Sequence, residues 1–306
     1  MSARPTEPAG HGSFSIDGHT LPAPALAPGL YVVSTPIGNL KDITIRALGT
    51  LAAADLVACE DTRVTAVLTR HYGIRAPLIA YHEHNAEQQR PRILAALAEG
   101  KVVALVSDAG TPLVSDPGFR LVGAAVEAGH AVYPIPGASA LLAALVPAGL
   151  PTDAFLFAGF LPNRTAGRRK RLTALAAVPA TLVFYESPHR IAESLADMAA
   201  VLGDARPAAV ARELTKTFET VRRGTLAELA AAFGEGPDPR GEIVILVGPP
   251  LETEPDAADV DERLIALLAE HPVKEAARLA AEATGLAKRD LYQRALELKA
   301  GDGDGP

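Results

Sequence analysis

Three short loops contain hydroxyls and glycines, and one of them also contains carboxylates; each loop directly follows a run of apolar residues. The longest, residues 107–118, holds two aspartates, two glycines and two prolines. Glycine lets a ligand approach the backbone closely, proline makes the path rigid, and carboxylates accept hydrogen bonds from ribose hydroxyls or an ammonium group. We therefore expect Asp108 to contact a ligand. A tight strand-to-helix turn explains Asp116 better, as the cap of a helix that starts at Pro117.

The other two loops are residues 34–39 and residues 135–140. In the second, Ser139 and the free backbone amides of the following helix can hold a polar ligand group. The first lacks the Gly-x-Gly-x-x-Gly spacing of a dinucleotide site, and the chain has no Gly-Lys-Ser/Thr phosphate loop. These absences disfavour a Rossmann dehydrogenase and a P-loop nucleotidase. Together the three loops predict one ligand site at the carboxyl ends of neighbouring strands.

The elements that carry these loops alternate between short apolar strands and longer helical patterns. This alternation predicts an α/β domain over residues 29–149 with a mainly parallel sheet covered on both faces. A junction at 147–153 leads to a second α/β domain, residues 150–250, with more mixed strand direction. The predicted strands are 30–34, 56–59, 78–81, 102–106, 131–135, 154–158, 181–185, 208–211, 220–223 and 243–247, and the predicted helices of the first domain are 43–54, 86–98 and 119–128.

Both ends of the chain differ from this α/β body. Residues 1–28 are rich in Pro, Gly and Ala, which predicts a disordered tail and not a signal peptide. An acidic linker, 251–258, leads to a small helical domain, 259–300, whose three short helices and glycine turn resemble a helix-turn-helix unit. A packing appendage is the alternative. We expect Leu291 and Ala295 to face inward on the last helix, with its basic residues outward.

Composition narrows the classes of protein. Aromatic residues make up 5% of the chain and Trp is absent, which argues against a module that binds single strands mainly by base stacking. A single cysteine, Cys59, excludes an internal disulfide and fits a reducing cytoplasm; we expect it to be buried. No apolar run reaches the roughly 18 residues that span a bilayer, so no membrane partner is expected.

The net charge of −7 is unevenly distributed. From residue 251 onward the chain has 13 acidic and 7 basic residues, so the first 250 residues are almost neutral. Within residues 160–190 the only acidic residue is Glu186, and the basic residues are Arg164, Arg168, Arg169, Lys170, Arg171 and Arg190. This excess predicts an RNA-binding patch that faces phosphates. A solvated helix face is the open alternative.

Seven motifs in one order resemble the ribosomal RNA small subunit methyltransferase I group of the tetrapyrrole methylase superfamily. The resemblance covers about residues 30–249, and the last helices resemble the small helical domain of that group. It implies a two-domain tetrapyrrole-methylase-like α/β fold with a C-terminal three-helix unit. The motifs are Thr35–Leu40, Glu60–Arg63, Tyr81–Asn85, Ser107–Gly118, Pro136–Ser139, Tyr185–Arg190 and Arg212–Lys216.

The resemblance implies S-adenosylmethionine as methyl donor, held between the two α/β domains. It also implies transfer to the ribose 2′-oxygen of a cytidine in the decoding region of 16S rRNA, with the small ribosomal subunit as partner, and a homodimer. The chain has Ser107-Asp108-Ala109 where the wider superfamily has Gly-Asp-Pro. The cofactor contacts that the resemblance implies are Pro36, Ile37, Gly38, Asp108, Thr111, Ser139 and Ala140.

A ribose hydroxyl needs a proton acceptor when its oxygen attacks a methyl group. Candidates near predicted strand ends are Glu60, Asp61, His84, Glu186, His189 and Lys216. We predict a catalytic carboxylate from Glu60 or Glu186; an ion-pair network of Glu60, Asp61 and Arg63 is the alternative for the first. His82 and His84 lack a third ligand at a defined spacing, so no metal site is predicted. A tetrapyrrole methylase and a non-catalytic RNA-binding assembly factor are the competing functions.

Overall fold

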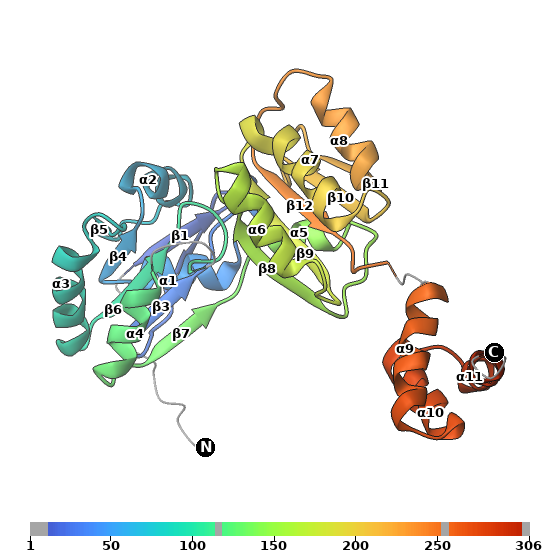
Figure 1. The fold of residues 1–306 in the computed structure, drawn as a ribbon. Helices are drawn as coiled ribbons and strands as arrows, with labels where there is room; N and C mark the ends of the chain where they lie inside the picture. The colour runs from blue at the N-terminus through green and yellow to red at the C-terminus, as the bar shows by residue number, and fades with distance from the viewer. Residues whose placement is uncertain (1–11, 114–117, 252–256, 302–306) are drawn as a thin grey trace, which may run out of the picture. The chain divides into compact units, whose positions relative to one another are not determined.

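The computed structural model describes residues 12–113, 118–251 and 257–301. The chain forms two compact units, Met1–Pro250 and Leu251–Pro306. The larger unit contains two five-stranded sheets and a short hairpin, and the smaller unit is helical (Figure 1). Across the described ranges, no helix has the length and apolar character needed to cross a membrane. The predicted cap at Asp116 and most of the predicted linker 251–258 lie outside the described residues.

The first sheet is entirely parallel, as predicted, in the order β5-β4-β6-β3-β7. Its strands are β3 (Gly29–Val33), β4 (Leu56–Cys59), β5 (Leu78–Ala80), β6 (Val102–Val106) and β7 (Val132–Ile135). Every residue of β6 is buried, because successive side chains point to opposite faces and both faces are covered. Cys59 is buried as predicted.

Four helices cover this sheet, two on each face. Helices α1 (Ile45–Ala53) and α2 (Thr62–His71) share one core with alternate strand residues, and α3 (Ala86–Ala98) and α4 (Phe119–Glu127) share the other. A short 3-10 turn, Leu40–Asp42, precedes α1. The helices therefore hold the carboxyl ends of the strands, and the loops that follow them, in a fixed arrangement.

The second sheet is mixed, also as predicted, in the order β11-β10-β12-β9-β8. Only β8 and β9 pair in parallel; the other three pairs are antiparallel. The strands are β8 (Phe155–Phe160), β9 (Thr181–Glu186), β10 (Pro207–Arg212), β11 (Thr220–Thr225) and β12 (Ile243–Val247). Because β12 is antiparallel to β9 and β10, it begins at the edge of the sheet where they end.

The two faces of the second sheet have different covers. Helices α6 (Thr165–Leu175), α7 (Ile191–Leu202) and α8 (Leu226–Gly234) pack on one face. A 3-10 turn, Pro188–Arg190, leads into α7. The opposite face packs against α5 (Ala140–Leu145), which follows the last strand of the first sheet. Because α5 comes from the first half and packs on the sheet of the second, the two halves share this apolar core.

The prediction of a disordered tail over residues 1–28 is wrong for residues 12–28. Strands β1 (Ser13–Ile16) and β2 (His19–Pro22) form an antiparallel hairpin, and Phe14 is only 4% exposed in the core beside α1. The hairpin turns at Asp17 and Gly18, which both have positive φ, as a two-residue Asp-Gly turn requires. The prediction relied on the Pro-, Gly- and Ala-rich composition of the segment and overlooked the Asp17-Gly18 turn. Residues 1–11 lie outside the described part.

The smaller unit consists of α9 (Ala257–Glu270), α10 (Val273–Thr284) and α11 (Lys288–Gly301). The three helices pack around a small apolar core of their own. Leu291 and Ala295 are buried in this core, and Lys288 and Arg289 are exposed, as the helical pattern predicts.

Candidate active site

The loops that follow β3, β6 and β7 are joined by hydrogen bonds. Thr35 and Gly110 exchange two backbone hydrogen bonds of 2.9 and 3.1 Å between the first and second loops. The Thr111 hydroxyl donates to the Ala138 carbonyl at 3.2 Å and accepts from the Ser34 hydroxyl at 3.2 Å. Because these bonds cross between loops far apart in the sequence, the predicted meeting of the three loops is confirmed.

Gly110 is needed where the second loop passes closest to the first. Its φ of +79° lies in the left-handed region, which glycine adopts without steric cost. A Cβ there would also lie 3.2 Å from the Ile37 side chain. A side chain at this position would therefore strain the backbone and crowd the cavity beside it.

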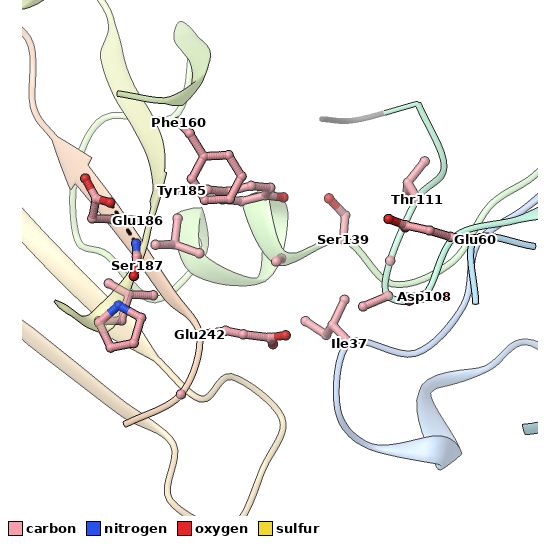
Figure 2. Close-up of a pocket in the computed structure, with 17 residues that line it drawn as sticks. Ile37, Glu60, Asp108, Thr111, Ser139, Phe160, Tyr185, Glu186, Ser187 and Glu242 are labelled. Carbon is pink, nitrogen blue, oxygen red and sulfur yellow. Dashed lines mark hydrogen bonds between the residues drawn. The ribbon is translucent and has the colours of Figure 1, made fainter. Parts of the chain in front are cut away.

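A cavity of about 500 Å³ opens at the carboxyl ends of the strands of both sheets; we call it the main cavity. Figure 2 shows the side chains of the first half facing those of the second across it. From the first half it is lined by Ile37, Glu60, Asp108, Ala109, Gly110, Thr111, Ser139 and Ala140, and from the second by Phe160, Tyr185–Pro188 and Gly241–Val244. Five of the seven predicted cofactor contacts thus line one cavity.

The remaining two, Pro36 and Gly38, line a second cavity of about 330 Å³, the side cavity. Ile37, Asp108, Ala109 and Glu242 line both cavities. The first loop therefore lies along two adjoining spaces and not one.

Every charged side chain among the described residues of the main cavity is acidic. Burial raises the pKa of the Glu60 carboxyl, and the nearby negative charge of Asp108 raises it further. Asp108 accepts a hydrogen bond from the backbone of Asp61 at 3.0 Å, which fixes its carboxylate beside Glu60. Such a site favours a cationic ligand with hydroxyl donors over a phosphate or a carboxylate.

Asp61, next to Glu60, has a different role. It caps α2 by accepting from the backbone of Arg63 at 2.8 Å, and it pairs with the Arg63 side chain at 2.6 Å. These hydrogen bonds lower its pKa to about 2. In the ranges that the structure describes, Glu60 has no ion pair, so the proposed network of Glu60, Asp61 and Arg63 holds only for its last two members.

Three other candidates for proton acceptor lie away from the main cavity or are engaged. His84 is exposed, and His189 contacts Asp238 at 3.0 Å on the surface. Lys216 lines the side cavity and donates to the carboxylates of Glu213 and Glu242 at 2.8 and 3.0 Å. Burial opposes its charge, but these bonds hold the pKa of Lys216 above its usual value, so it remains protonated.

The prediction of Glu186 as a catalytic base is wrong, because its carboxylate is already used inside the protein. The residue is 3% exposed, and its side chain turns away from the main cavity (Figure 2). It accepts from the backbone of Ser187 at 2.7 Å, from Arg190 at 2.9 Å and from the Ser194 hydroxyl at 2.5 Å. A buried carboxylate whose oxygens already accept these hydrogen bonds is not presented to a substrate.

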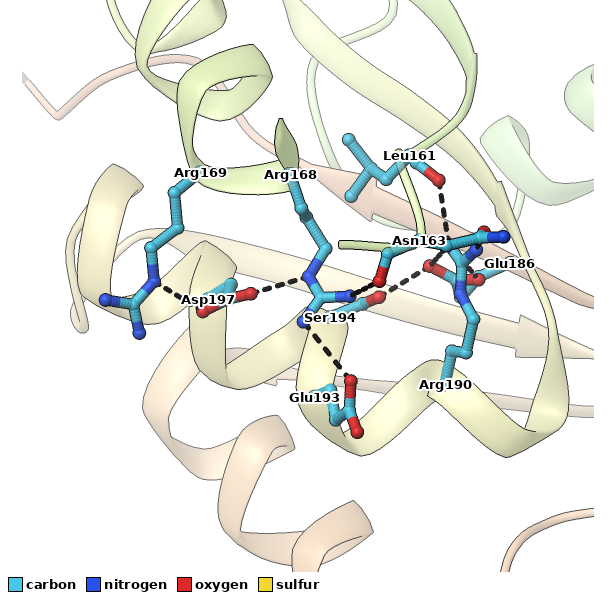
Figure 3. A network of polar contacts seen from close by, with 9 residues as sticks. All are labelled: Leu161, Asn163, Arg168, Arg169, Glu186, Arg190, Glu193, Ser194 and Asp197. Atoms are coloured by element: carbon cyan, nitrogen blue, oxygen red, sulfur yellow. Dashed lines mark hydrogen bonds and ion pairs between the residues drawn. The ribbon is translucent and has the colours of Figure 1, made fainter. Parts of the chain in front are cut away.

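The prediction that Arg168 binds RNA is also wrong. Its side chain is 2% exposed and donates to Asp197 at 2.5 Å and to Glu193 at 3.3 Å (Figure 3). The helical spacing of α6 turns this one residue of the basic run toward α7, where a buried guanidinium needs carboxylate partners.

The other basic residues of the run differ in their access to solvent. Arg164, Lys170 and Arg171 are exposed. Arg169 is exposed as well, although it donates to Asp197 at 2.6 Å. Arg190 is half-buried and contacts Glu186, Asn163 and the Leu161 carbonyl (Figure 3).

Sequence reasoning missed Glu242 and the aromatic pair Phe160 and Tyr185. Glu242 directly precedes β12, so a search of the residues that follow strands could not find it. The antiparallel direction of β12 brings it to the same edge as the ends of β9 and β10. Phe160 ends β8 and lies beside Tyr185, with ring centroids 5.7 Å apart. The sequence signal that could have indicated this pair is an aromatic residue at or next to the end of a predicted strand.

Two family models match the chain. The model for tetrapyrrole (corrin/porphyrin) methylases matches residues 29–230, and the model for the RsmI C-terminal HTH domain matches residues 254–299. A ribosomal RNA small subunit methyltransferase I from Mesorhizobium japonicum is 59% identical over 287 residues, which cover 93% of this chain and 98% of the relative. A protein of the same name from Pseudomonas aeruginosa is 53% identical over 272 residues, with 88% and 96% covered.

Solved structures share the fold at lower identity. A cobalt precorrin-4 methyltransferase aligns with a TM-score of 0.56 and 21% identity over 72% of this chain and 94% of its own. A uroporphyrin-III C-methyl transferase from Thermus thermophilus, complexed with S-adenyl homocysteine, aligns with a TM-score of 0.51 and 23% identity over 71% and 96%. Diphthine synthase aligns with a TM-score of 0.57 and 18% identity over 72% and 89%. At these identities the likeness concerns the fold alone.

Proposed function

Because the chain belongs to the ribosomal RNA small subunit methyltransferase I family of tetrapyrrole methylases, we propose that it methylates 16S rRNA with S-adenosylmethionine as donor. The acceptor that we propose is the ribose 2′-oxygen of a cytidine in the decoding region. The observation that carries the proposal is the main cavity, where the carboxylates of Glu60 and Asp108, without an ion pair among the described residues, lie beside apolar lining residues.

The residues of the main cavity fit the methyl donor by their chemistry. S-adenosylmethionine supplies, when bound, an electrophilic methyl group on a positively charged sulfur. Carboxylates stabilise a sulfonium and an ammonium and accept hydrogen bonds from ribose hydroxyls. Asp108 and Glu242 are suited to these contacts, and the hydroxyls of Thr111 and Ser139, in the same half as Asp108, can add polar contacts. Ile37, Ile243 and Val244 supply apolar contacts.

Glu60 is the residue that we propose as proton acceptor for the attacking 2′-hydroxyl. Its raised pKa makes its carboxylate a stronger base than that of an ordinary glutamate. Orientation of the hydroxyl toward the methyl group supplies the larger share of the rate, roughly 7–11 kcal/mol in well-oriented systems. The loops around the main cavity, which are joined by hydrogen bonds, are the elements that we expect to provide this orientation.

We propose that the exposed basic residues around α6 bind RNA phosphates and that the C-terminal unit contributes to binding of the small ribosomal subunit. The exposed residues Arg164, Arg169, Lys170 and Arg171 lie in one short segment that begins just after the cavity-lining end of β8. Lys288 and Arg289 are exposed at the start of α11. Action in the cytoplasm and a homodimer stay predictions from the family.

The experiment that tests the proposed function is transfer of a tritiated methyl group from the labelled donor to three acceptors. We expect label in unmodified small ribosomal subunits, and nucleoside analysis of their 16S rRNA should give a 2′-O-methylated cytidine. Label in uroporphyrinogen alone would contradict the proposal in favour of a tetrapyrrole methylase. Binding of subunits without any transfer would indicate a non-catalytic assembly factor. Comparison with naked 16S rRNA identifies which form is the substrate.

A further inference from the structure

Phe160 is an apolar ring that the fold leaves in solvent at the edge of the main cavity. It is 59% exposed, although it lines the cavity. Tyr185 meets it in a T-shaped contact, with an interplanar angle of 67° and centroids 5.7 Å apart. This contact covers at most one face of the Phe160 ring, so the other face remains available to a flat partner.

The backbone that follows Phe160 is held by two arginines, the buried Arg168 and the half-buried Arg190. Arg190 donates to the Leu161 carbonyl at 2.9 Å and also contacts the side chain of Asn163. Arg168 donates to the Asn163 carbonyl at 3.3 Å (Figure 3). Both arginines are themselves fixed by carboxylates of the second half. Two of the basic side chains that the charge pattern assigns to phosphates thus hold the segment that presents Phe160.

We propose that Phe160 is the stacking surface for the base of the acceptor nucleotide. This inference rests on the proposed function and names how its substrate is held. Sequence-specific recognition of RNA uses unstacked bases that are splayed out and stacked on aromatic rings. A nucleotide whose ribose enters the main cavity loses its stacking neighbours in the RNA, and a rigid exposed ring at the rim restores one of them.

The position of Phe160 favours the acceptor over the donor as its partner. Phe160 is the last residue of β8, and α6, which begins five residues later at Thr165, carries the exposed Arg169, Lys170 and Arg171. A strand whose phosphates contact this segment brings its bases to the same rim. The donor, in contrast, is expected beside Asp108 and the three loops of the first half.

The test uses full-length variants Phe160→Ala, Phe160→Leu and Phe160→Tyr, with Phe155→Ala as matched control. Phe155 is 42% exposed at the opposite end of the same strand. For each variant, kcat and KM are measured with unmodified small ribosomal subunits, and the affinity for S-adenosylhomocysteine is measured by calorimetry. Because Phe160 is exposed, none of these changes is expected to unfold the protein, and circular dichroism checks this.

We expect Phe160→Ala to raise KM for the subunit by about 5- to 150-fold, the range that base stacking on an aromatic side chain provides. The kcat at saturation and the affinity for S-adenosylhomocysteine should stay close to those of the wild type. Phe160→Leu should behave like Phe160→Ala, because it keeps apolar volume without a π-face, and Phe160→Tyr should restore KM. Phe155→Ala should have no effect.

Three results would overturn the inference. The first is an unchanged KM in Phe160→Ala, and the second is full activity in Phe160→Leu, which would make the contact merely apolar. The third is a loss of affinity for S-adenosylhomocysteine that matches the change in KM, which would assign the ring to the donor. In each case an active wild type leaves the proposed function standing. An inactive wild type would overturn both.

Discussion

The two halves of the larger unit hold their carboxylates in opposite ways. In the first half, Glu60 and Asp108 face the main cavity, and neither has an ion pair among the described residues. In the second half, Glu186 and Asp197 are buried, and each is paired with at least one arginine. Glu60, Asp108 and Glu186 all lie at or just after the end of a strand, whereas Asp197 lies within α7.

The difference shows that residue type and position after a strand do not decide the role of a carboxylate. The decisive feature is whether the fold supplies a counter-ion. Removal of the charge from an acid without a counter-ion changes the chemistry of the cavity, whereas removal of one partner of a buried pair leaves an uncompensated charge and costs stability. Four predictions test this comparison.

The largest effect is expected for Glu60→Gln. This change removes the proposed proton acceptor but keeps the size and polarity of the side chain, so kcat should fall by about 10²- to 10⁴-fold. The affinity for S-adenosylhomocysteine should change little. Rates come from methyl transfer to small ribosomal subunits at saturating donor. Asp61→Asn is the control, and an equal loss of kcat in that variant would remove the distinction between the two neighbouring acids.

Asp197→Ala should lower the free energy of unfolding by about 3–5 kcal/mol, because it leaves Arg168 buried with one remaining, exposed carboxylate partner. Burial opposes ionisation of Asp197, but hydrogen bonds from Arg169 and Arg168 keep its pKa below the usual value. Its contribution is therefore present at neutral pH and is lost as the pH falls through the depressed pKa. Urea denaturation of the full chain measures both effects. A loss below 1 kcal/mol would mean that the pair is not structural.

A smaller effect, on RNA affinity, is expected to distinguish the exposed basic residues of α6 from the buried Arg168. Simultaneous change of Arg169, Lys170 and Arg171 to glutamine should weaken RNA binding and reduce the slope of log affinity against log salt by about 0.7 for each phosphate that the variant no longer neutralises. Arg168→Gln should leave the slope unchanged, because Arg168 is buried. Filter binding at several salt concentrations compares the two variants. Equal slopes in the triple variant and the wild type would indicate that the exposed basic residues form a solvated helix face and do not bind RNA phosphates.

The smallest effect concerns pH. Burial is the main cause of the raised pKa of Glu60, and the charge of Asp108 adds to it. In Asp108→Asn the acidic limb of the rate profile should therefore move to lower pH, since Glu60 then loses its proton more easily. The same variant should bind the donor more weakly. A limb that stays in place at saturating donor would show that Glu60 is not the group that titrates.

Much of the fold could be predicted from the sequence, because each parallel strand is a short apolar run bounded by polar loops. The strands β4 and β6 and helix α3 have the predicted bounds. The N-terminal hairpin was missed because average composition outweighed an Asp-Gly turn of two residues. Long-range packing, in which Phe14 is buried beside α1, stabilises it.

The site could be predicted on one side only. The three loops of the first half follow parallel strands, where a general rule places ligands. Glu242 precedes an antiparallel strand, so its place at the same edge depends on strand pairing that sequence patterns do not specify. The burial of Arg168 depends on which face of α6 meets α7, and the low apolar periodicity of this arginine-rich helix did not indicate it.

The most direct test of the central claim compares Glu60→Gln with Glu186→Gln in single-turnover methyl transfer to small ribosomal subunits. Rates are normalised to the folded fraction of each protein. We predict that Glu60→Gln stays folded and loses the rate, and that Glu186→Gln loses stability while its folded fraction transfers at close to the wild-type rate. A folded Glu186→Gln that cannot transfer, beside an active Glu60→Gln, would contradict the roles given to the two acids.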